Sequence, residues 1–136
     1  MNTCNKLAKY FEIPADNVEE LADNRYLIDG TEYLVLTDSE ADDLARECIL
    51  DSLWAFNANF IASHTENGLD DDAVEALAEM QGKLGESANS IVKALIVDLD
   101  HFVNDAIMSD GRGHFITSYD GQEIEIDGDL YAYRMN

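Results

Sequence analysis

Two Asp-Gly dipeptides constrain the fold of this chain more than any other feature. Asp29-Gly30 and Asp127-Gly128 each separate two short segments that have the composition of strands. Asp-Gly suits a two-residue hairpin turn because both turn positions need a positive φ. A lone two-stranded hairpin is only marginally stable in water, so we expect both ends of the chain to join one antiparallel sheet. The expected strands of these hairpins are residues 25–28, 31–36, 123–126 and 130–134.

The C-terminal segment is expected to hold one more strand. Residues 114–118 carry aromatic and β-branched side chains, and Asp120-Gly121 supplies a turn before residues 123–126. The pattern of residues 114–134 therefore predicts a three-stranded meander.

The N-terminal segment is expected to be helical. Residues 5–11 have an amphipathic pattern that predicts a short helix ending before Pro14. Asp16 then has the position of a helix cap, so a second helical turn carrying Val18 and Leu21 is expected.

The first long helix is predicted from Thr37 and Glu40, which have the spacing of a capping box. The apolar pattern continues to about residue 63. In its second half Leu50, Trp54 and Ile61 make the opposite face apolar as well. A helix that is apolar on all sides is buried by its own domain or by a partner subunit. These three residues are therefore the candidate interface of a homodimer.

Two further long helices are expected. The three aspartates at 70–72 place negative charge at the first turn of one helix, where its dipole favours it, and this helix ends near Gly82 or Gly85. The other runs from about residue 86 to 109, because apolar side chains recur there at three- and four-residue steps. Its expected core stripe is Ala88, Ile91, Val92, Leu95, Leu99, Phe102, Val103 and Ala106.

Together these elements predict an α+β fold with three main helices packed on a small antiparallel sheet built from N- and C-terminal hairpins. A length of 136 residues fits a single domain over 1–136. Hydrophobic residues make up 46% of the chain, which is too much for a disordered acidic chain.

The charge of the chain excludes several classes of partner. Twenty-nine acidic residues against eight basic ones give a formal net charge of −21. Phosphate binding needs Lys and Arg, so we expect no direct contact with nucleic acid or with an anionic membrane. No apolar run reaches the length of a membrane span, and the first residues lack the apolar region of a signal peptide. We therefore expect a cytoplasmic protein.

Four carboxylates form a regular stripe in the first long helix. Glu40, Asp43, Glu47 and Asp51 recur at three- and four-residue steps, and residues 37–110 carry −14 of the net charge. A net charge of about 2–8 is enough to keep a small domain soluble. An excess of this size would be attracted rapidly to a basic groove that normally binds nucleic acid. Asp98 and Asp105 are candidate extensions of this contact. The alternative is a solvated acidic face that only aids solubility or suits high salt.

A metal site is a second candidate. Asp98, His101 and Asp105 have helical spacing, and Asp110 and His114 follow just beyond the helix. Carboxylate and imidazole at such spacing can share a metal ion, but a surface histidine among acidic neighbours gives the same pattern. We therefore assign no metal ligands and no cofactor.

Other chemical motifs lack their required residues. Residues 70–72 are not followed by the glycine and glutamate of a calcium loop, and no nucleophile has the spacing of a hydrolase motif. The sequence thus predicts a protein that is not an enzyme. Arg112 and Arg134 either tie the strands to the acidic helices or contact an anion.

Several segments resemble a group of small uncharacterised bacteriophage proteins. The resemblance spans most of the chain and is clearest in Tyr33-Leu34-Val35-Leu36-Thr37, Asp51-Ser52-Leu53-Trp54-Ala55-Phe56-Asn57, Ser109-Asp110-Gly111-Arg112-Gly113-His114-Phe115 and Tyr119-Asp120-Gly121. In charge and size the chain is also similar to phage anti-defence proteins of the anti-CRISPR and antirestriction type, several of which imitate nucleic acid. These resemblances imply a protein made in an infected bacterium that inhibits a host nucleic-acid-binding protein through its basic surface. The alternative function is a non-catalytic oligomeric accessory protein of the phage.

Overall fold

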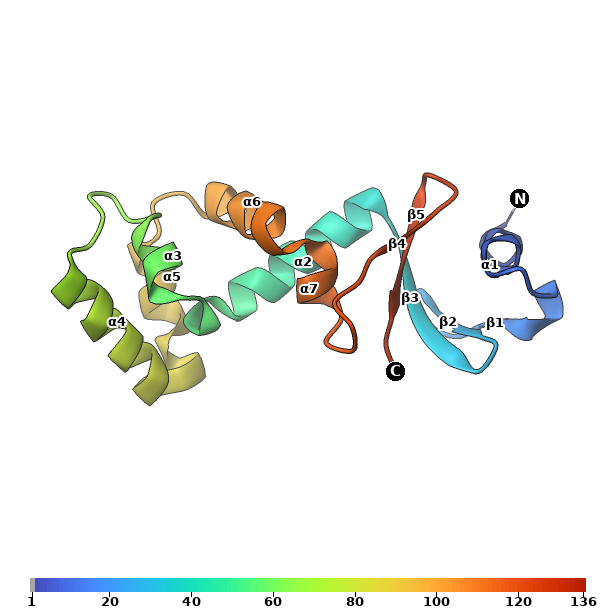
Figure 1. The fold of residues 1–136 in the computed structure, drawn as a ribbon, viewed down its shortest axis with the longest axis horizontal. Helices are drawn as coiled ribbons and strands as arrows, with labels where there is room; N and C mark the ends of the chain where they lie inside the picture. The colour runs from blue at the N-terminus through green and yellow to red at the C-terminus, as the bar shows by residue number, and fades with distance from the viewer. Residues whose placement is uncertain (1) are drawn as a thin grey trace. The chain divides into compact units, whose positions relative to one another are not determined.

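Within residues 2–136, which the computed structural model describes, a five-stranded antiparallel sheet joins the two ends of the chain (Figure 1). The strands are β1 (Val18–Glu20), β2 (Arg25–Ile28), β3 (Thr31–Thr37), β4 (Ile124–Ile126) and β5 (Leu130–Arg134), in the order β1-β2-β3-β5-β4. The N- and C-terminal parts meet where β3 pairs with β5, from Tyr33 opposite Arg134 to Thr37 opposite Leu130. The predicted α+β class and the joining of the two ends in one antiparallel sheet are confirmed.

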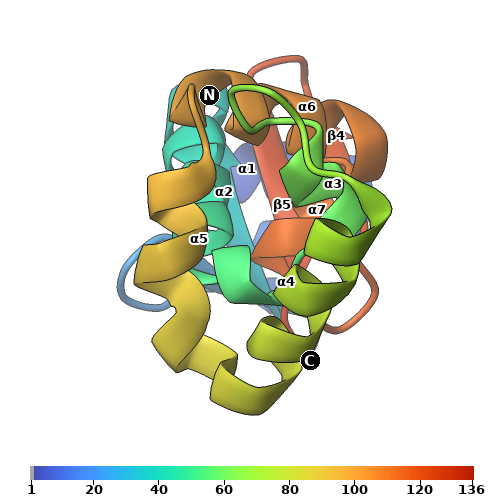
Figure 2. The same ribbon diagram turned by 90° about the vertical axis from the view of Figure 1, so that its left-hand side faces the viewer.

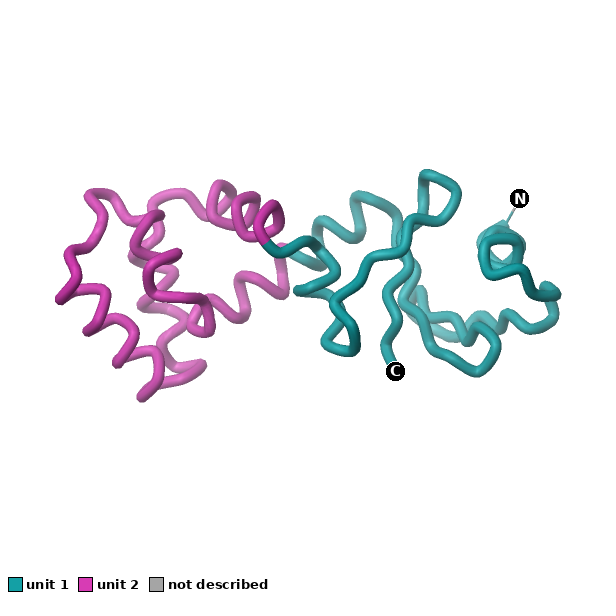
Figure 3. The backbone as a smooth tube through the Cα atoms, viewed as in Figure 1, with its two compact units in different colours: residues 1–45, 110–136 teal, residues 46–109 magenta. Residues whose placement is uncertain are grey.

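The chain divides into two compact units (Figure 3). Unit 1 comprises residues 1–45 and 110–136, and unit 2 comprises residues 46–109. The α-helices are α1 (Thr3–Phe11), α2 (Asp38–Asp51), α3 (Ala58–Ala62), α4 (Asp71–Leu84), α5 (Asn89–Leu95), α6 (Leu99–Asp110) and α7 (Arg112–Ile116). Short 3₁₀ turns are η1 (Ala15–Asn17), η2 (Leu53–Ala55) and η3 (Gly85–Ala88). A single domain over 1–136 remains our prediction.

Both Asp-Gly pairs form the predicted turns. Asp29 and Gly30 have φ values of 49° and 86°, and Asp127 and Gly128 have 55° and 75°. Glycine and aspartate adopt this left-handed backbone more readily than most residues do, which is why the pairs mark the hairpins.

The sheet of unit 1 has a helix on each side. Figures 1 and 2 show α1 on one side of β5 and α7 on the other. The α1 side contains a core of buried apolar residues from the helix and from all five strands: Leu7, Ala8, Val18, Tyr26, Ile28, Val35, Ile126 and Ala132. Because side chains alternate along a strand, Leu34, Leu36 and Tyr133 are buried on the opposite face.

Two of the predicted helix starts, at Thr37 and at the three aspartates of residues 70–72, are confirmed. Thr37 accepts a hydrogen bond from the Glu40 backbone N–H, and the Glu40 carboxylate accepts one from the Thr37 backbone N–H. This is the reciprocal capping box at the start of α2. Asp70 caps α4 by accepting from the Ala73 backbone N–H at 2.8 Å.

The prediction that the first long helix continues to residue 63 is wrong, because α2 ends at Asp51 and a separate α3 follows. Two amide side chains hold the irregular segment between them. Gln81, which is buried, donates to the carbonyl oxygens of Trp54 and Phe56 at 2.8 and 2.7 Å. Asn89 donates to the Leu50 carbonyl and accepts from the Trp54 N–H. These bonds satisfy backbone groups that a continuous helix would have paired internally.

The prediction of one helix over 86–109 is also wrong. The segment divides into η3, α5 and α6, with extended backbone at Ile96. Asp98 accepts a hydrogen bond from the His101 N–H and so begins α6 as a new helix. The division rotates two expected core residues, Ile91 and Leu95, to exposed positions.

Two smaller predictions fail in unit 1. Residues 114–118 are not a strand, because α7 covers Arg112–Ile116 and leaves the C-terminal part with β4 and β5. The buried Gly113 packs directly against the backbone at Gly121 and Gln122, and this contact overrides the β-propensity of the segment. In place of a helical turn, Val18 begins β1, which pairs with β2.

None of the helices in the described part of the chain is long and apolar enough to cross a membrane.

Replacing Gly113 with alanine should destabilise unit 1. A Cβ there would lie 2.6 Å from the Gly121 carbonyl oxygen and 2.8 Å from the Gln122 carbonyl carbon, so backbone must move. We expect the free energy of unfolding in urea to fall by about 2 kcal/mol. The matched control is Gly82→Ala within α4, where a Cβ meets no neighbouring group within 4 Å and should add about 0.5–1 kcal/mol. Equal stability of Gly113→Ala and the wild type would contradict the close backbone packing.

Replacing Gln81 with methionine should leave the Trp54 and Phe56 carbonyl oxygens without a side-chain donor. Unsatisfied partly buried backbone groups cost about 1–3 kcal/mol, and we expect a loss of about 2 kcal/mol in the same denaturation measurement. Gln122→Met, at an exposed glutamine, should change stability by less than about 0.5 kcal/mol. If the two variants were equally stable, the hydrogen bonds of Gln81 would not be what holds the break after α2.

Candidate functional site

The predicted acidic stripe lies on one exposed face of α2. Glu40, Asp43, Glu47 and Asp51 are all exposed. At about 100° and 1.5 Å per residue, the four carboxylates fall within an arc of about 80° and span about 16 Å along the axis. They therefore form a line of negative charge with about 5.5 Å between neighbours. We call these four residues the acidic stripe.

The other side of α2 is neutralised by Arg112. Its Nη1 donates to Asp38 Oδ1 at 2.8 Å and to Asp42 Oδ1 at 3.0 Å, and its Nε donates to Glu123 Oε1 at 2.9 Å. The guanidinium carbon also lies 4.7 Å from the centre of the Tyr131 ring. The first of the two roles predicted for Arg112, tying the C-terminal part to the acidic helix, is confirmed.

The Arg112 side chain is only 11% exposed, so these partners, in place of water, compensate its positive charge. Burial acts to lower the pKa of Arg112, but the hydrogen bonds to Glu123, Asp38 and Asp42 outweigh it and the pKa lies above its ordinary value. Glu123 is shared, because the buried Tyr133 hydroxyl donates to the same carboxylate. Burial and this hydrogen bond raise the pKa of Tyr133, so the phenol stays protonated.

The acidic stripe has no such partner. Among residues 2–136, no cation forms an ion pair with Asp43, Glu47 or Asp51, and Arg46 of the same helix pairs with Asp100 instead. Glu40 is held by the Thr37 backbone N–H and by the Asn24 side chain. The hydrogen bonds from Thr37 lower the pKa of Glu40 and keep it ionised. The stripe therefore keeps its negative charge, with three of its carboxylates unpaired.

The two predicted extensions of the stripe already have other contacts. Asp98 is exposed and caps α6 through the His101 N–H. Asp105 Oδ2 lies 3.2 Å from His64 Nε2 and 3.3 Å from His101 Nε2. Asp105 thus belongs to a cluster with two imidazoles.

The structure places one residue of the candidate dimer interface in the core. Ile61 is 0% exposed and lies in the core of unit 2, so it offers no surface to a partner. Leu50 and Trp54 are half-buried, and their backbone is held by Asn89. The apolar pattern on the second face reflects the break between α2 and α3, which turns Ile61 inwards.

His64, His101 and Asp105, which we call the histidine cluster, could together hold a metal ion, because one ligand atom from each lies within 4.8 Å of the others. Of the residues predicted for a metal site, the structure brings His101 and Asp105 together and leaves Asp98 as a cap. Asp110 and His114 are not part of this cluster in the described chain. His64 was missed because no local spacing connects it to a helix about forty residues later. The available signal was a histidine at the end of an apolar segment.

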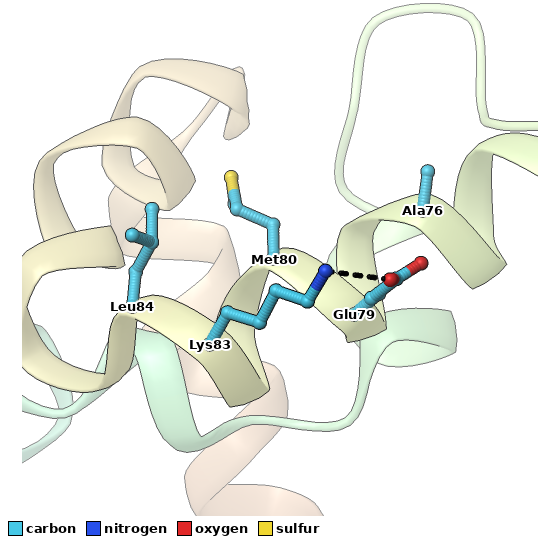
Figure 4. Close-up of a pocket in the computed structure, with 5 residues that line it drawn as sticks. All are labelled: Ala76, Glu79, Met80, Lys83 and Leu84. Atoms are coloured by element: carbon cyan, nitrogen blue, oxygen red, sulfur yellow. Dashed lines mark ion pairs between the residues drawn. The ribbon is translucent and has the colours of Figure 1, made fainter.

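Arg134, the second arginine singled out in the sequence, and a surface hollow on α4 offer little for catalysis. The Arg134 guanidinium lies 4.4 Å from the centre of the Tyr119 ring, and its Nε donates to the Asn136 carbonyl oxygen. A shallow hollow of about 360 Å³ lies on α4. It is lined by Ala76, Glu79, Met80, Lys83 and Leu84 (Figure 4). Its charged groups, Glu79 and Lys83, pair with each other at 2.9 Å, so its lining combines an apolar surface with one neutralised pair.

Comparisons with protein-family models, with curated proteins and with solved structures find no match to this chain.

Replacing Arg112 with methionine should remove a largely buried cation and leave Asp38, Asp42 and Glu123 facing one another. Loss of one partner from such a network costs about 3 kcal/mol. Lys93→Met is the matched control, because it changes the net charge equally at an exposed residue that has no ion-pair partner in the described chain. Chemical denaturation should show a large loss for Arg112→Met and a change below about 0.5 kcal/mol for Lys93→Met. Equal stability of the two variants would show that net charge, not this network, determines the cost.

Proposed function

We propose that this chain is an acidic, non-catalytic binding protein that occupies the basic nucleic-acid-binding surface of a bacterial defence protein and inhibits it. In this proposal it is made in the cytoplasm of a phage-infected cell, as the resemblance of its sequence to phage proteins implies. The observation that carries the proposal is the acidic stripe: four exposed carboxylates in line on one helix, none of which forms an ion pair with a cation among residues 2–136.

The spacing of the stripe suits a surface that binds phosphates. Its carboxylates are about 5.5 Å apart along the helix axis. The phosphates of one DNA strand are about 3.4 Å apart, so the stripe presents more than half of that charge density along α2. A groove lined with Lys and Arg that accepts a nucleic-acid strand could therefore accept α2.

The placement of the cations also supports binding to a basic protein rather than to nucleic acid. Arg25, Arg46 and Arg112 form ion pairs with carboxylates of the same chain, and so do Lys6 and Lys83. These contacts leave little positive charge for phosphate groups. A formal charge of −21 also exceeds the roughly 2–8 that solubility requires, and it adds self-repulsion that weakens the fold.

A homodimer is the alternative. With Ile61 in the core, its candidate interface is reduced to the half-buried Leu50 and Trp54. The acidic stripe has the larger exposed surface, so we favour it as the contact.

Neutralising the stripe should abolish binding to the partner without unfolding the protein. The variant is Asp43→Asn/Glu47→Gln/Asp51→Asn, which spares the capping residue Glu40. In affinity capture from nuclease-treated bacterial lysate, the wild type should retain one or more basic proteins. We expect the triple variant to lose at least about 90% of that capture, because electrostatic attraction provides most of the encounter rate. Capture by the wild type should also fall steeply between low and high salt.

The matched control removes three other exposed carboxylates, in Glu66→Gln/Glu75→Gln/Glu86→Gln. It carries the same net charge as the stripe variant but keeps α2 intact. Capture should persist with this control. Equal losses in both variants would show that overall charge, not the stripe, attracts the partner, and equal retention in both would exclude the stripe as the contact.

A further inference from the structure

We propose that the histidine cluster of unit 2 is a binding site for a divalent transition-metal ion of the zinc type, with His64, His101 and Asp105 as ligands. This proposal goes beyond the proposed function and does not depend on it. It rests on the convergence of three ligand atoms from the segment after α3 and from α6.

The separations within the cluster fit a tetrahedral ion. Zinc binds histidine nitrogen and carboxylate oxygen at about 2.0–2.2 Å, so two ligands at the tetrahedral angle lie about 3.3 Å apart. The two nitrogen–oxygen separations are 3.2 Å for His64 and 3.3 Å for His101, both measured to Asp105 Oδ2. One ligand atom from each of the three residues lies within 4.8 Å of the others.

The buried ligand is held in place before any ion binds. The His64 side chain is 6% exposed, and its ring packs at 5.1 Å from the ring centres of Phe60 and Phe102. The backbone is fixed as well, because the His64 N–H donates to the Ile61 carbonyl and the His64 carbonyl accepts from the Val97 N–H. A ligand fixed by packing and by backbone bonds loses little entropy on binding.

The open side of the cluster faces solvent. The side chains of His101 and Asp105 are 64% and 40% exposed, so an ion could enter and keep a water molecule as a fourth ligand. Two imidazoles and one carboxylate suit Zn²⁺, Co²⁺ or Fe²⁺, whereas Ca²⁺ and Mg²⁺ prefer oxygen ligands alone. Residues 46–109 contain three basic and twelve acidic side chains, a charge of −9 that attracts cations to this unit.

A bound ion would connect the end of α3 to α6. These elements are separated by α4 and α5 along the chain, so the ion would add a link across unit 2 to the ring contact that Phe60 of α3 makes with Phe102 of α6. The expected consequence is a higher melting temperature of the metal-loaded protein, because a ligand that binds the folded state stabilises it.

The test is titration of the chelator-treated full chain with Zn²⁺ by calorimetry and with Co²⁺ by visible absorption, in buffer with excess Mg²⁺ to occupy non-specific carboxylates. We expect one equivalent of Zn²⁺ to bind, the intense visible absorption of tetrahedral Co²⁺, and a rise in melting temperature. His101→Gln and Asp105→Asn should each weaken binding at least about 100-fold, which is the upper end of what loss of an outer-shell partner costs. His101 is exposed, so its replacement should leave the fold unchanged.

His114→Gln is the matched control, because it removes the remaining histidine of the chain at another exposed position. It should bind Zn²⁺ like the wild type. The proposal is overturned if the wild type binds no Zn²⁺ in excess Mg²⁺, or if His101→Gln and His114→Gln bind it equally well. In either case the three side chains form only an imidazole–carboxylate ion pair.

Discussion

Arg112 forms ion pairs with three carboxylates from two segments of the chain. The arrangement of unit 1 depends on this contact. Asp38 and Asp42 come from the start of α2, and Glu123 precedes β4. Arg112 itself begins α7 next to the closely packed Gly113. A chain with so few cations cannot neutralise its carboxylates evenly. Placing one buried arginine here stabilises unit 1 and decides which side of α2 stays negative.

The charge that remains has two consequences in different parts of the chain. On α2 it leaves the acidic stripe, whose exposed carboxylates form a line suited to a basic groove. In unit 2 the unneutralised carboxylates include Asp105, whose Oδ2 atom contacts both His64 and His101. The first arrangement supports binding to a basic protein, and the second supports binding of a small cation. Both follow from an excess of carboxylates over arginines and lysines, most of which already form ion pairs within the described chain.

Local signals in the sequence were sufficient to predict the hairpins, the capping box at Thr37 and the α+β class. Each depends on residues within a few positions of one another. The breaks in the long helices were not predictable in this way, because Gln81 and Asn89 hold a segment that lies about thirty residues earlier. The same limit applies to the sites. The stripe lies on one helix and could be derived from its spacing, whereas His64 reaches Asp105 only through the fold. The prediction of a strand at 114–118 was wrong because Gly113 packs against the backbone of Gly121 and Gln122, a contact that the composition of the segment does not indicate.

The central claim is that α2 occupies the place of a nucleic-acid strand on its partner. The most direct measurement is equilibrium competition, in which the partner retained by affinity capture is titrated with labelled duplex DNA at several fixed concentrations of this protein. We expect mutually exclusive binding, so that the apparent Kd for DNA rises linearly with the concentration of this protein. A ternary complex of partner, DNA and this protein, with an unchanged Kd for DNA, would contradict it.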